Sequence, residues 1–599
     1  MMDDPPKTEP NSFDLLNLPL SFVGIAERSR RLLVDWMTRC DLPGVRAASA
    51  DPLDVTSSFL DLTSKMMSDP AKLVKAQVSL WQDYLELWQN TTSRLLGQAV
   101  TTTTEGGADP RFRDEIWEEN NIFNYIKQSY LLTTRWLEWL VRDVNGMDAR
   151  TRETVQFYTR QFISALSPTN FALTNPEVIR TTIETRGENL LNGLNNLLHD
   201  LESMQHVIWR GGEKGGWPSD SGTAAPTPGK VIFRNELMEV IRYAPATRTV
   251  WKRPLLFIPA WINKYYLFDL NARNSLVAWA IAEGHTVFMI SWVDPDEEVC
   301  RRSFEDYVLN GTLQAIDIVE RSTGESRINA VGYCIGGTLL AATAAYLAKR
   351  GDTRIATATF LTTMLDFSQP GDLGVFVDEA TLSYLEQQRD RSDANDAAEI
   401  ALLFNLLREQ DLLWAFVVNN YLLGRDSFPF DLLRWNADAT RMPIAMHSYY
   451  LRNFYQKNKL VEPGGINIGG EAIDLRRILV PSYFLAARED HLGPWKSIYK
   501  ATQVLGGPSR FTLTASGHIA GVVNPPSARK YCYWVNQRSP ANPDEWLASA
   551  RQVEGSWWPD WHEWLSRNAD TGRVAASRPG SQRLPSMGNA PGEYVRLRA

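Results

Sequence analysis

The chain has 599 residues, of which 44% are hydrophobic and 22% charged, and its formal net charge is −8. This length and apolar content permit a large core and favour several domains over one. The negative charge argues against a nucleic-acid partner, and an anionic substrate would need a locally basic pocket. Only four cysteines occur, without a CxxC pair, so we expect neither a zinc cluster nor a disulfide scaffold.

Residues 1–210 are expected to form a helical N-terminal domain. The opening MMDDPPKTEP lacks the apolar core of a secretory signal, and no apolar run is long enough to span a bilayer, so we expect a cytoplasmic protein without a transmembrane segment. One helical face in this region carries an apolar stripe formed by Val74, Val78, Trp81, Leu85 and Trp88. Such an aromatic stripe usually packs in an intramolecular core or a dimer interface, and the alternative is contact with a membrane or granule surface.

Residues 211–230, rich in Gly, Pro and Ser, are predicted to be a linker, and residues 231–570 a catalytic domain. In this domain, apolar runs alternate with helical stretches, which predicts an α/β fold whose ligand site lies at the carboxyl ends of parallel strands. The strand-like runs are PLLFIPA, HTVFMISW, RINAVGYC, ATATFLTTM, LVPSYFLAA and RFTLTAS.

The alternation fails between about 368 and 475, where helical segments rich in Trp, Tyr and Leu predict an inserted cap. Residues 571–599 contain few large apolar side chains, and we therefore expect a disordered tail.

The motif VGYCIGG, residues 331–337, joins a predicted strand to a predicted helix. It has the G-x-S-x-G spacing of a nucleophile elbow, with Cys334 in place of serine and with Gly332 and Gly336 permitting a tight turn. This context favours a nucleophile over a buried structural cysteine. The fold class expected is therefore an α/β-hydrolase fold with an inserted cap, preceded by a helical domain.

An elbow nucleophile needs an acid and a histidine later in the chain. Asp490 and His518 each follow a predicted strand, at the edge where the site must lie. Glu489 is the alternative acid and His491 the alternative base, but His518 has the expected order along the chain. A histidine bonded to the thiol would generate a reactive thiolate near neutral pH.

Two backbone N–H groups are expected to hold the oxyanion. One belongs to Ile335, the residue after the nucleophile, and the candidate for the other is Ile262, in the loop after the PLLFIPA strand.

Several motifs together resemble the class I polyhydroxyalkanoate synthases, bacterial polymerases of 3-hydroxyacyl-CoA. The similarity covers about residues 109–535 and rests on SPTNFALTNPE, INKYYLFDLNARNSLV, EGHTVFMISW, GYCIGG, REDHLGPW and SGHIAGVVNPP. The cap stretch FPFDLLRWNADAT, with Trp435, Asn436 and Asp438, is also similar to the family. The chain departs from related enzymes at Ala260 and Trp261, where those enzymes have proline and cysteine, and this departure adjoins the loop of Ile262.

The resemblance implies a catalytic set. Cys334 would carry the acyl group, His518 would be the base, and Asp490 would either orient His518 or activate the incoming hydroxyl. The implied reaction polymerises (R)-3-hydroxyacyl-CoA, chiefly 3-hydroxybutyryl-CoA, into polyester with release of CoA. The implied partners are the growing polyester, the polymer granule surface and a second copy of the chain, and no cofactor or metal is expected.

Two other functions share these features. A cysteine-dependent acyl-CoA thioesterase or ester hydrolase would use the same three residues with water as acceptor, because one fold hosts many reactions. A granule-binding protein with an inactive hydrolase fold is the second alternative, against which the complete Cys, Asp and His set argues.

Overall fold

The computed structural model describes residues 55–96, 109–209, 224–377, 414–425 and 440–597, apart from short gaps within these ranges, together with isolated positions between 378 and 439. Most of the expected linker and much of the expected cap lie outside the described residues. The contacts divide the chain into two compact units. One is Met1–Lys214 with Asp411–Phe428, and the other is Gly215–Gln410 with Pro429–Ala599.

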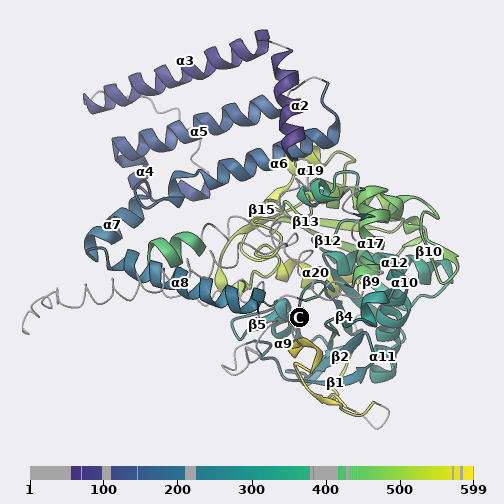
Figure 1. Ribbon diagram of the computed structural model, residues 1–599. Helices are drawn as coiled ribbons and strands as arrows, with labels where there is room; N and C mark the ends of the chain where they lie inside the picture. The colour runs from purple at the N-terminus through teal and green to yellow at the C-terminus, as the bar shows by residue number, and fades with distance from the viewer. Residues whose placement is uncertain are drawn as a thin grey trace, which may run out of the picture. The chain divides into compact units, whose positions relative to one another are not determined.

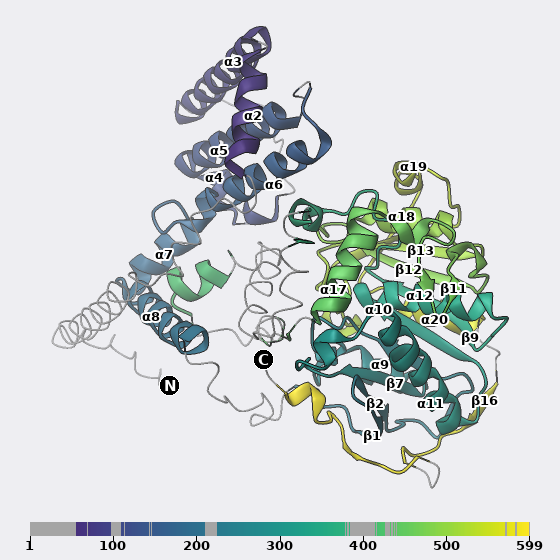
Figure 2. The ribbon, with the colours of Figure 1, turned by 45° about the vertical axis from the view of Figure 1, so that its right-hand side comes forward.

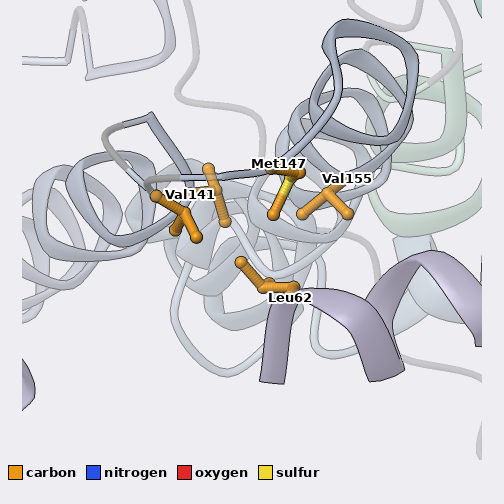
Figure 3. Packing of buried hydrophobic residues seen from close by; sticks show 5 residues of the cluster. Leu62, Val141, Met147 and Val155 are labelled. Atoms are coloured by element: carbon orange, nitrogen blue, oxygen red, sulfur yellow. The ribbon is translucent and has the colours of Figure 1, made fainter. Parts of the chain in front are cut away.

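The first unit is helical, with α3 packed on α5, α5 on α6, and α2 on α6 (Figure 1). Tyr84 of α3 donates a hydrogen bond to the carbonyl of Ser129 in α5, at 3.2 Å. A buried cluster that includes Leu62, Val141 and Val155 joins α2, α5 and α6 (Figure 3). The helices are α2 (Val55–Met67), α3 (Pro70–Leu95), α4 (Ile116–Glu119), α5 (Asn121–Arg142), α6 (Ala149–Ala165), α7 (Pro176–Glu184) and α8 (Glu188–Trp209).

The apolar stripe of α3 is exposed in the part of the chain that the structure describes. The exposed fraction is 48% for Val78 and 68% for Trp81, with the other three members between these values. The stripe is therefore not packed against the described helices, although its spacing is compatible with an intramolecular core.

A segment of the predicted cap packs against the N-terminal helices. The π-helical turn η9 (Val418–Leu422) lies on α8, where the Asn189 side chain donates to the Leu422 carbonyl at 2.8 Å (Figure 2). Arg425 and Glu177 form an ion pair at 2.6 Å. A Cβ atom at Gly193 would lie 1.9 Å from the Tyr421 carbonyl oxygen, so this contact requires glycine. The insertion predicted between 368 and 475 is thus divided between the two units.

The second unit is built on an 11-stranded sheet of order β15-β14-β13-β12-β9-β8-β4-β7-β2-β1-β17. Its central strands, from β7 to β13 in this order, are parallel, and the strands that flank them are antiparallel. The parallel strands are β4 (Leu255–Ile258), β7 (Val287–Trp292), β8 (Ile328–Tyr333), β9 (Ile355–Leu361), β12 (Ser482–Ala487) and β13 (Ser509–Thr514). They coincide with the runs predicted from sequence. The flanking strands are β1 (Gly229–Arg234), β2 (Met238–Tyr243), β14 (Cys532–Val535), β15 (Arg551–Glu554) and β17 (Gly588–Asn589).

Helices cover both faces of this sheet. The chain runs from β4 to its neighbour β7 and then crosses back to β8, on the other side of β4. Because each crossover is right-handed, α9 lies on one face of the sheet and α11, α12 and α18 lie on the other. The last helix, α20, shares the face of α9, because the rings of Trp279 and Trp558 lie 5.5 Å apart. These helices are α9 (Leu276–Ala282), α11 (Gln314–Thr323), α12 (Ile335–Lys349), α18 (Trp495–Val504) and α20 (Trp558–Asn568). This is the expected α/β-hydrolase architecture.

The end of the chain is packed, and the prediction of a disordered tail was wrong. Strand β16 (Arg573–Ala575) pairs with β3 (Thr249–Trp251), and β17 pairs with β1. Val595 is 1% exposed, and its carbonyl accepts a hydrogen bond from the Lys264 ammonium at 2.8 Å. Main-chain pairing and a few anchored positions order this segment, and neither is visible in its composition.

Among the described helices, none combines the length and apolar character that a bilayer-spanning segment requires.

Replacing Val595 by alanine should lower the free energy of unfolding by about 2 kcal/mol, because two buried methyl groups lose their contacts. Urea denaturation followed by tryptophan fluorescence measures this. Val574, 38% exposed in the same tail, is the matched control, and its alanine variant should stay within about 0.5 kcal/mol of the native chain. Equal stability of the two variants would contradict an anchored tail.

Candidate active site

Cys334 lies at the sharp turn between β8 and α12, with backbone φ 52° and ψ −126°. A positive φ is uncommon for a residue with a side chain and persists only where the surroundings enforce it. Here the Cys334 N–H donates to the Leu361 carbonyl at 2.9 Å, and the Cys334 carbonyl accepts from the Thr363 hydroxyl at 3.1 Å. Neighbouring strand β9 therefore holds the strained residue in place.

Glycines flank Cys334 because the backbone on either side is tightly packed. A Cβ atom at Gly332 would lie 2.4 Å from the Cα of Gly337. At Gly336 it would lie 2.4 Å from the carbonyl oxygens of both Ile258 and Pro259. The motif thus brings the start of α12 against the end of β4, where the proposed oxyanion loop begins.

Asp490 and His518 meet at the carboxyl edge of the sheet, after β12 and β13 respectively. The distance from His518 Nδ1 to Asp490 Oδ2 is 2.6 Å, and both side chains are buried. The other carboxylate oxygen accepts the N–H groups of Leu492 and Gly493, at 2.9 and 2.8 Å. Since the acceptor at Nδ1 is a carboxylate, we assign the proton to Nδ1, which leaves Nε2 for the thiol of Cys334.

The surroundings of His518 favour its protonated form. Burial by itself would lower the pKa of His518, but the Asp490 carboxylate and the Cys334 sulfur, both hydrogen-bond partners of the ring, hold that pKa well above its usual range. The ring is therefore suited to accept a proton and to keep it near neutral pH.

The structure brings Cys334, Asp490 and His518 together and separates the two alternatives from them. The side chains of Glu489 and His491 are exposed, and the carbonyl of His491 accepts the N–H of Asp372 at 3.0 Å. Adjacent positions after a strand point to different sides, so only one acidic residue of the pair can reach the histidine.

The structure supports the two expected oxyanion donors to different degrees. Ile335 is the first residue of α12, so its N–H has no partner within the helix and lies next to the nucleophile. Ile262 lies in the loop after β4, three residues beyond Pro259, whose carbonyl packs against Gly336. Its role stays a prediction.

An aromatic cluster lies against the elbow, and we define it as Trp261, Tyr307, Phe367, Tyr450, Phe454 and Tyr455. The Trp261 and Tyr450 rings are 5.5 Å apart, and the Tyr450 hydroxyl lies 3.3 Å from the Thr338 hydroxyl in α12. Burial, and then the charge of Cys334, raises the pKa of Tyr450. Trp261 is 1% exposed, and its indole N–H has no hydrogen-bond partner among the described residues.

Sequence reasoning missed the contribution of β9. Thr362 and Thr363 lie near the end of the predicted strand ATATFLTTM, at the carboxyl edge of the sheet and beside the elbow. The sequence signal that could have identified these two threonines is their position at the end of the strand that follows the elbow strand along the chain. Within the described ranges, no group of three or more His, Cys, Asp or Glu side chains is arranged to hold a metal ion.

The parallel sheet, the elbow and the positions of Asp490 and His518 define an α/β-hydrolase-fold protein, and the sequence model of that fold matches residues 253–525. A second family model, described as the N-terminus of poly-beta-hydroxybutyrate polymerase (PhaC), matches residues 108–280.

Curated relatives match over most of the chain. A poly(3-hydroxyalkanoate) polymerase of Methylorubrum extorquens is 46% identical over 518 residues, covering 85% of this chain and 84% of that protein. The poly(3-hydroxyalkanoate) polymerase subunit PhaC of Rhizobium meliloti is 44% identical, covering 85% and 83%. The corresponding subunit of Cupriavidus necator is 40% identical, covering 82% and 83%. The chain belongs to the poly(3-hydroxyalkanoate) polymerase family.

The charge state of the elbow can be tested by alkylation with iodoacetamide, which reacts with thiolate. Because the raised pKa of His518 lets the ring take the thiol proton, Cys334 should be alkylated at least tenfold faster at pH 7 in the native chain than in His518→Gln. Peptide mass spectrometry measures both rates.

Cys532 is the internal control, because burial and the charge of Glu554 raise the pKa of its thiol. Its alkylation should need alkaline pH in both proteins. An alkylation rate of Cys334 that is the same with and without His518 would contradict the transfer of the thiol proton to His518.

Proposed function

We propose that this protein polymerises (R)-3-hydroxyacyl-CoA, chiefly 3-hydroxybutyryl-CoA, into polyhydroxyalkanoate with release of CoA, through an acyl thioester on Cys334. The observation that carries the proposal is a thiol at a strained elbow, bonded to a buried histidine whose other nitrogen meets a carboxylate. The names of the relatives support the polymerase assignment.

In the first step, the Cys334 thiolate attacks the carbonyl carbon of the acyl-CoA thioester. The tetrahedral oxyanion would be held by the N–H of Ile335 and, as a candidate, of Ile262; one such donor typically contributes on the order of 100- to 1000-fold in rate. The C–S bond to CoA then breaks, and the departing sulfur takes the proton from His518. One thioester replaces another, so the activation of the acyl group is retained.

In the second step, a 3-hydroxyl attacks the acyl group on Cys334. Neutral His518 takes the hydroxyl proton, the new ester bond forms, and the C–S bond to Cys334 breaks. Thiolate and imidazolium are restored together, and the conversion of thioester to oxoester is downhill. This explains the choice of cysteine, because a serine would form the oxoester before the chain is extended.

Asp490 has two proposed roles, and the geometry supports one of them more directly. Its Oδ2 contacts Nδ1 of His518, while backbone N–H groups occupy its Oδ1. Because both carboxylate oxygens already have hydrogen-bond partners, these contacts favour a role in which Asp490 orients the His518 ring and stabilises its positive charge. Activation of the hydroxyl would then belong to His518.

Exclusion of water distinguishes a polymerase from a thioesterase. The aromatic cluster lies over the part of α12 that follows the nucleophile, and Tyr450 and Tyr455 both lie close enough to Cys334 for its charge to affect them. Such an apolar cover protects a reactive thioester from hydrolysis. It supports acyl transfer to a 3-hydroxyl.

The proposal extends to a homodimer associated with polymer granules in the cytoplasm, as the family resemblance implies. The supporting observation is the exposed stripe of α3, which places two tryptophans, Trp81 and Trp88, among its five apolar side chains. A continuous exposed apolar face of this kind marks an interaction surface.

Cys334→Ala should reduce CoA release from 3-hydroxybutyryl-CoA on the order of 10⁴-fold or more, because the motif VGYCIGG offers no second thiol to carry the acyl chain. Steady-state release, measured with a thiol reagent, tests this. Cys300→Ala is the matched control and should keep at least half of the native rate, since Cys300 lies outside the elbow. Comparable losses in both variants would indicate a two-thiol mechanism.

The product decides between the candidate functions. Purified protein given 3-hydroxybutyryl-CoA should form insoluble polyester with little free 3-hydroxybutyrate, because the acyl thioester is shielded from water. Gas chromatography of both fractions, beside CoA release, measures the ratio. Stoichiometric free acid without polymer would indicate a thioesterase, and the absence of CoA release would indicate a binding protein.

A further inference from the structure

Thr362, the first residue after β9, has an unusual backbone conformation. Its φ is +44°, and the residue is 2% exposed. A β-branched residue rarely adopts positive φ, because its side chain crowds the following carbonyl. Such conformations cluster at active sites, where the surrounding structure enforces them.

The neighbours of Thr362 place it between the nucleophile and the acid. On one side, Leu361 and Thr363 both bond to the backbone of Cys334. On the other side, the Thr362 N–H donates to the Leu485 carbonyl of β12 at 2.7 Å. A Cβ atom at Gly493 would lie 3.6 Å from the Thr362 carbonyl oxygen and 3.4 Å from Asp490 Oδ2.

The hydroxyl of Thr362 is buried, and among the described residues it has no hydrogen-bond partner. A buried hydroxyl without a partner is destabilising, and valine would have the same shape without that cost. Other buried hydroxyls, such as that of Thr312, also have no hydrogen-bond partner in the part of the chain that the structure describes. Thr362 differs from Thr312 because it also has a strained backbone and lies between Cys334 and Asp490.

A threonine hydroxyl both donates and accepts, so it matches another hydroxyl. The indole N–H of Trp261, which is also buried without a partner, can only donate and would suit a carbonyl oxygen. A 3-hydroxyacyl group attached to Cys334 carries its hydroxyl two carbons from the thioester carbonyl, and Thr362 lies between Leu361 and Thr363, the two residues that bond to the Cys334 backbone.

We propose that Thr362 Oγ1 hydrogen-bonds the 3-hydroxyl of the acyl group that is transferred to Cys334, and that Thr362 selects hydroxylated over plain acyl thioesters. The inference rests on the proposed function. Selection at this step has a chemical purpose, because an acyl group without a 3-hydroxyl would leave the chain with no group to form the next ester.

The test compares single-turnover acylation by (R)-3-hydroxybutyryl-CoA and by butyryl-CoA, which lacks only the hydroxyl. CoA release and the mass of the acylated chain are measured for the native protein, Thr362→Val and Thr362→Ser. Thr362→Val should lose about fivefold to tenfold in the acylation rate constant with the hydroxylated substrate and less than twofold with butyryl-CoA. Thr362→Ser, which keeps the hydroxyl, should retain the native preference.

Equal losses with both substrates would overturn the inference and leave Thr362 a structural role. If valine prevents folding, Thr362→Ser and Thr362→Ala form the comparison, because they differ only in the hydroxyl; equal substrate preference in these two would overturn the inference as well. Failure of the proposed function is distinguishable, because the native protein would then either be acylated by neither substrate or release free 3-hydroxybutyrate in place of polyester.

Discussion

The strained turn at Cys334 is the constraint on which the rest of the site depends. Its positive φ requires that the backbones of β8, α12 and the end of β4 approach more closely than any side chain at Gly332 or Gly336 would allow. The same approach brings the loop after β4 to the nucleophile and places β9 where Thr363 can hold the Cys334 carbonyl. One packing arrangement therefore positions Cys334, the loop after β4 and the end of β9.

Electrostatics at the site depend on this packing. Burial alone would lower the pKa of His518, whereas Asp490 and Cys334 raise it. These two residues lie close to the ring only because β8, β12 and β13 end at the same edge of the sheet. The carboxylate of Asp490 is in turn held by two backbone N–H groups, so it is buried without losing its hydrogen bonds. The aromatic cluster connects the elbow helix to the cap, because Tyr450 contacts both Trp261 and Thr338.

Segments far apart in the sequence support the loop after β4. The Lys264 ammonium bonds to the carbonyl of Val595, and the Lys264 carbonyl accepts the indole N–H of Trp435 at 2.7 Å. Next to it, the Tyr266 hydroxyl donates to Asp438 at 2.9 Å. The end of the chain and the cap thus meet at the loop that carries the proposed second oxyanion donor. In the other unit, the cap contributes η9 to the surface of α8, so a single insertion supplies contacts to both units.

The sequence by itself determined the central strands, the elbow at Cys334, and the order of Asp490 and His518, because these follow from local periodicity, from glycine spacing and from position after a strand. It could not determine that Thr362 and Thr363 lie at the elbow, since β9 joins β8 only through the sheet. Nor could it show that the stripe of α3 is exposed, because helical spacing is the same for a buried and an exposed face. The order of the tail was also decided by tertiary structure. Its composition is poor in apolar side chains, whereas β16, β17 and Val595 are held by main-chain hydrogen bonds and by a buried lysine from distant parts of the chain.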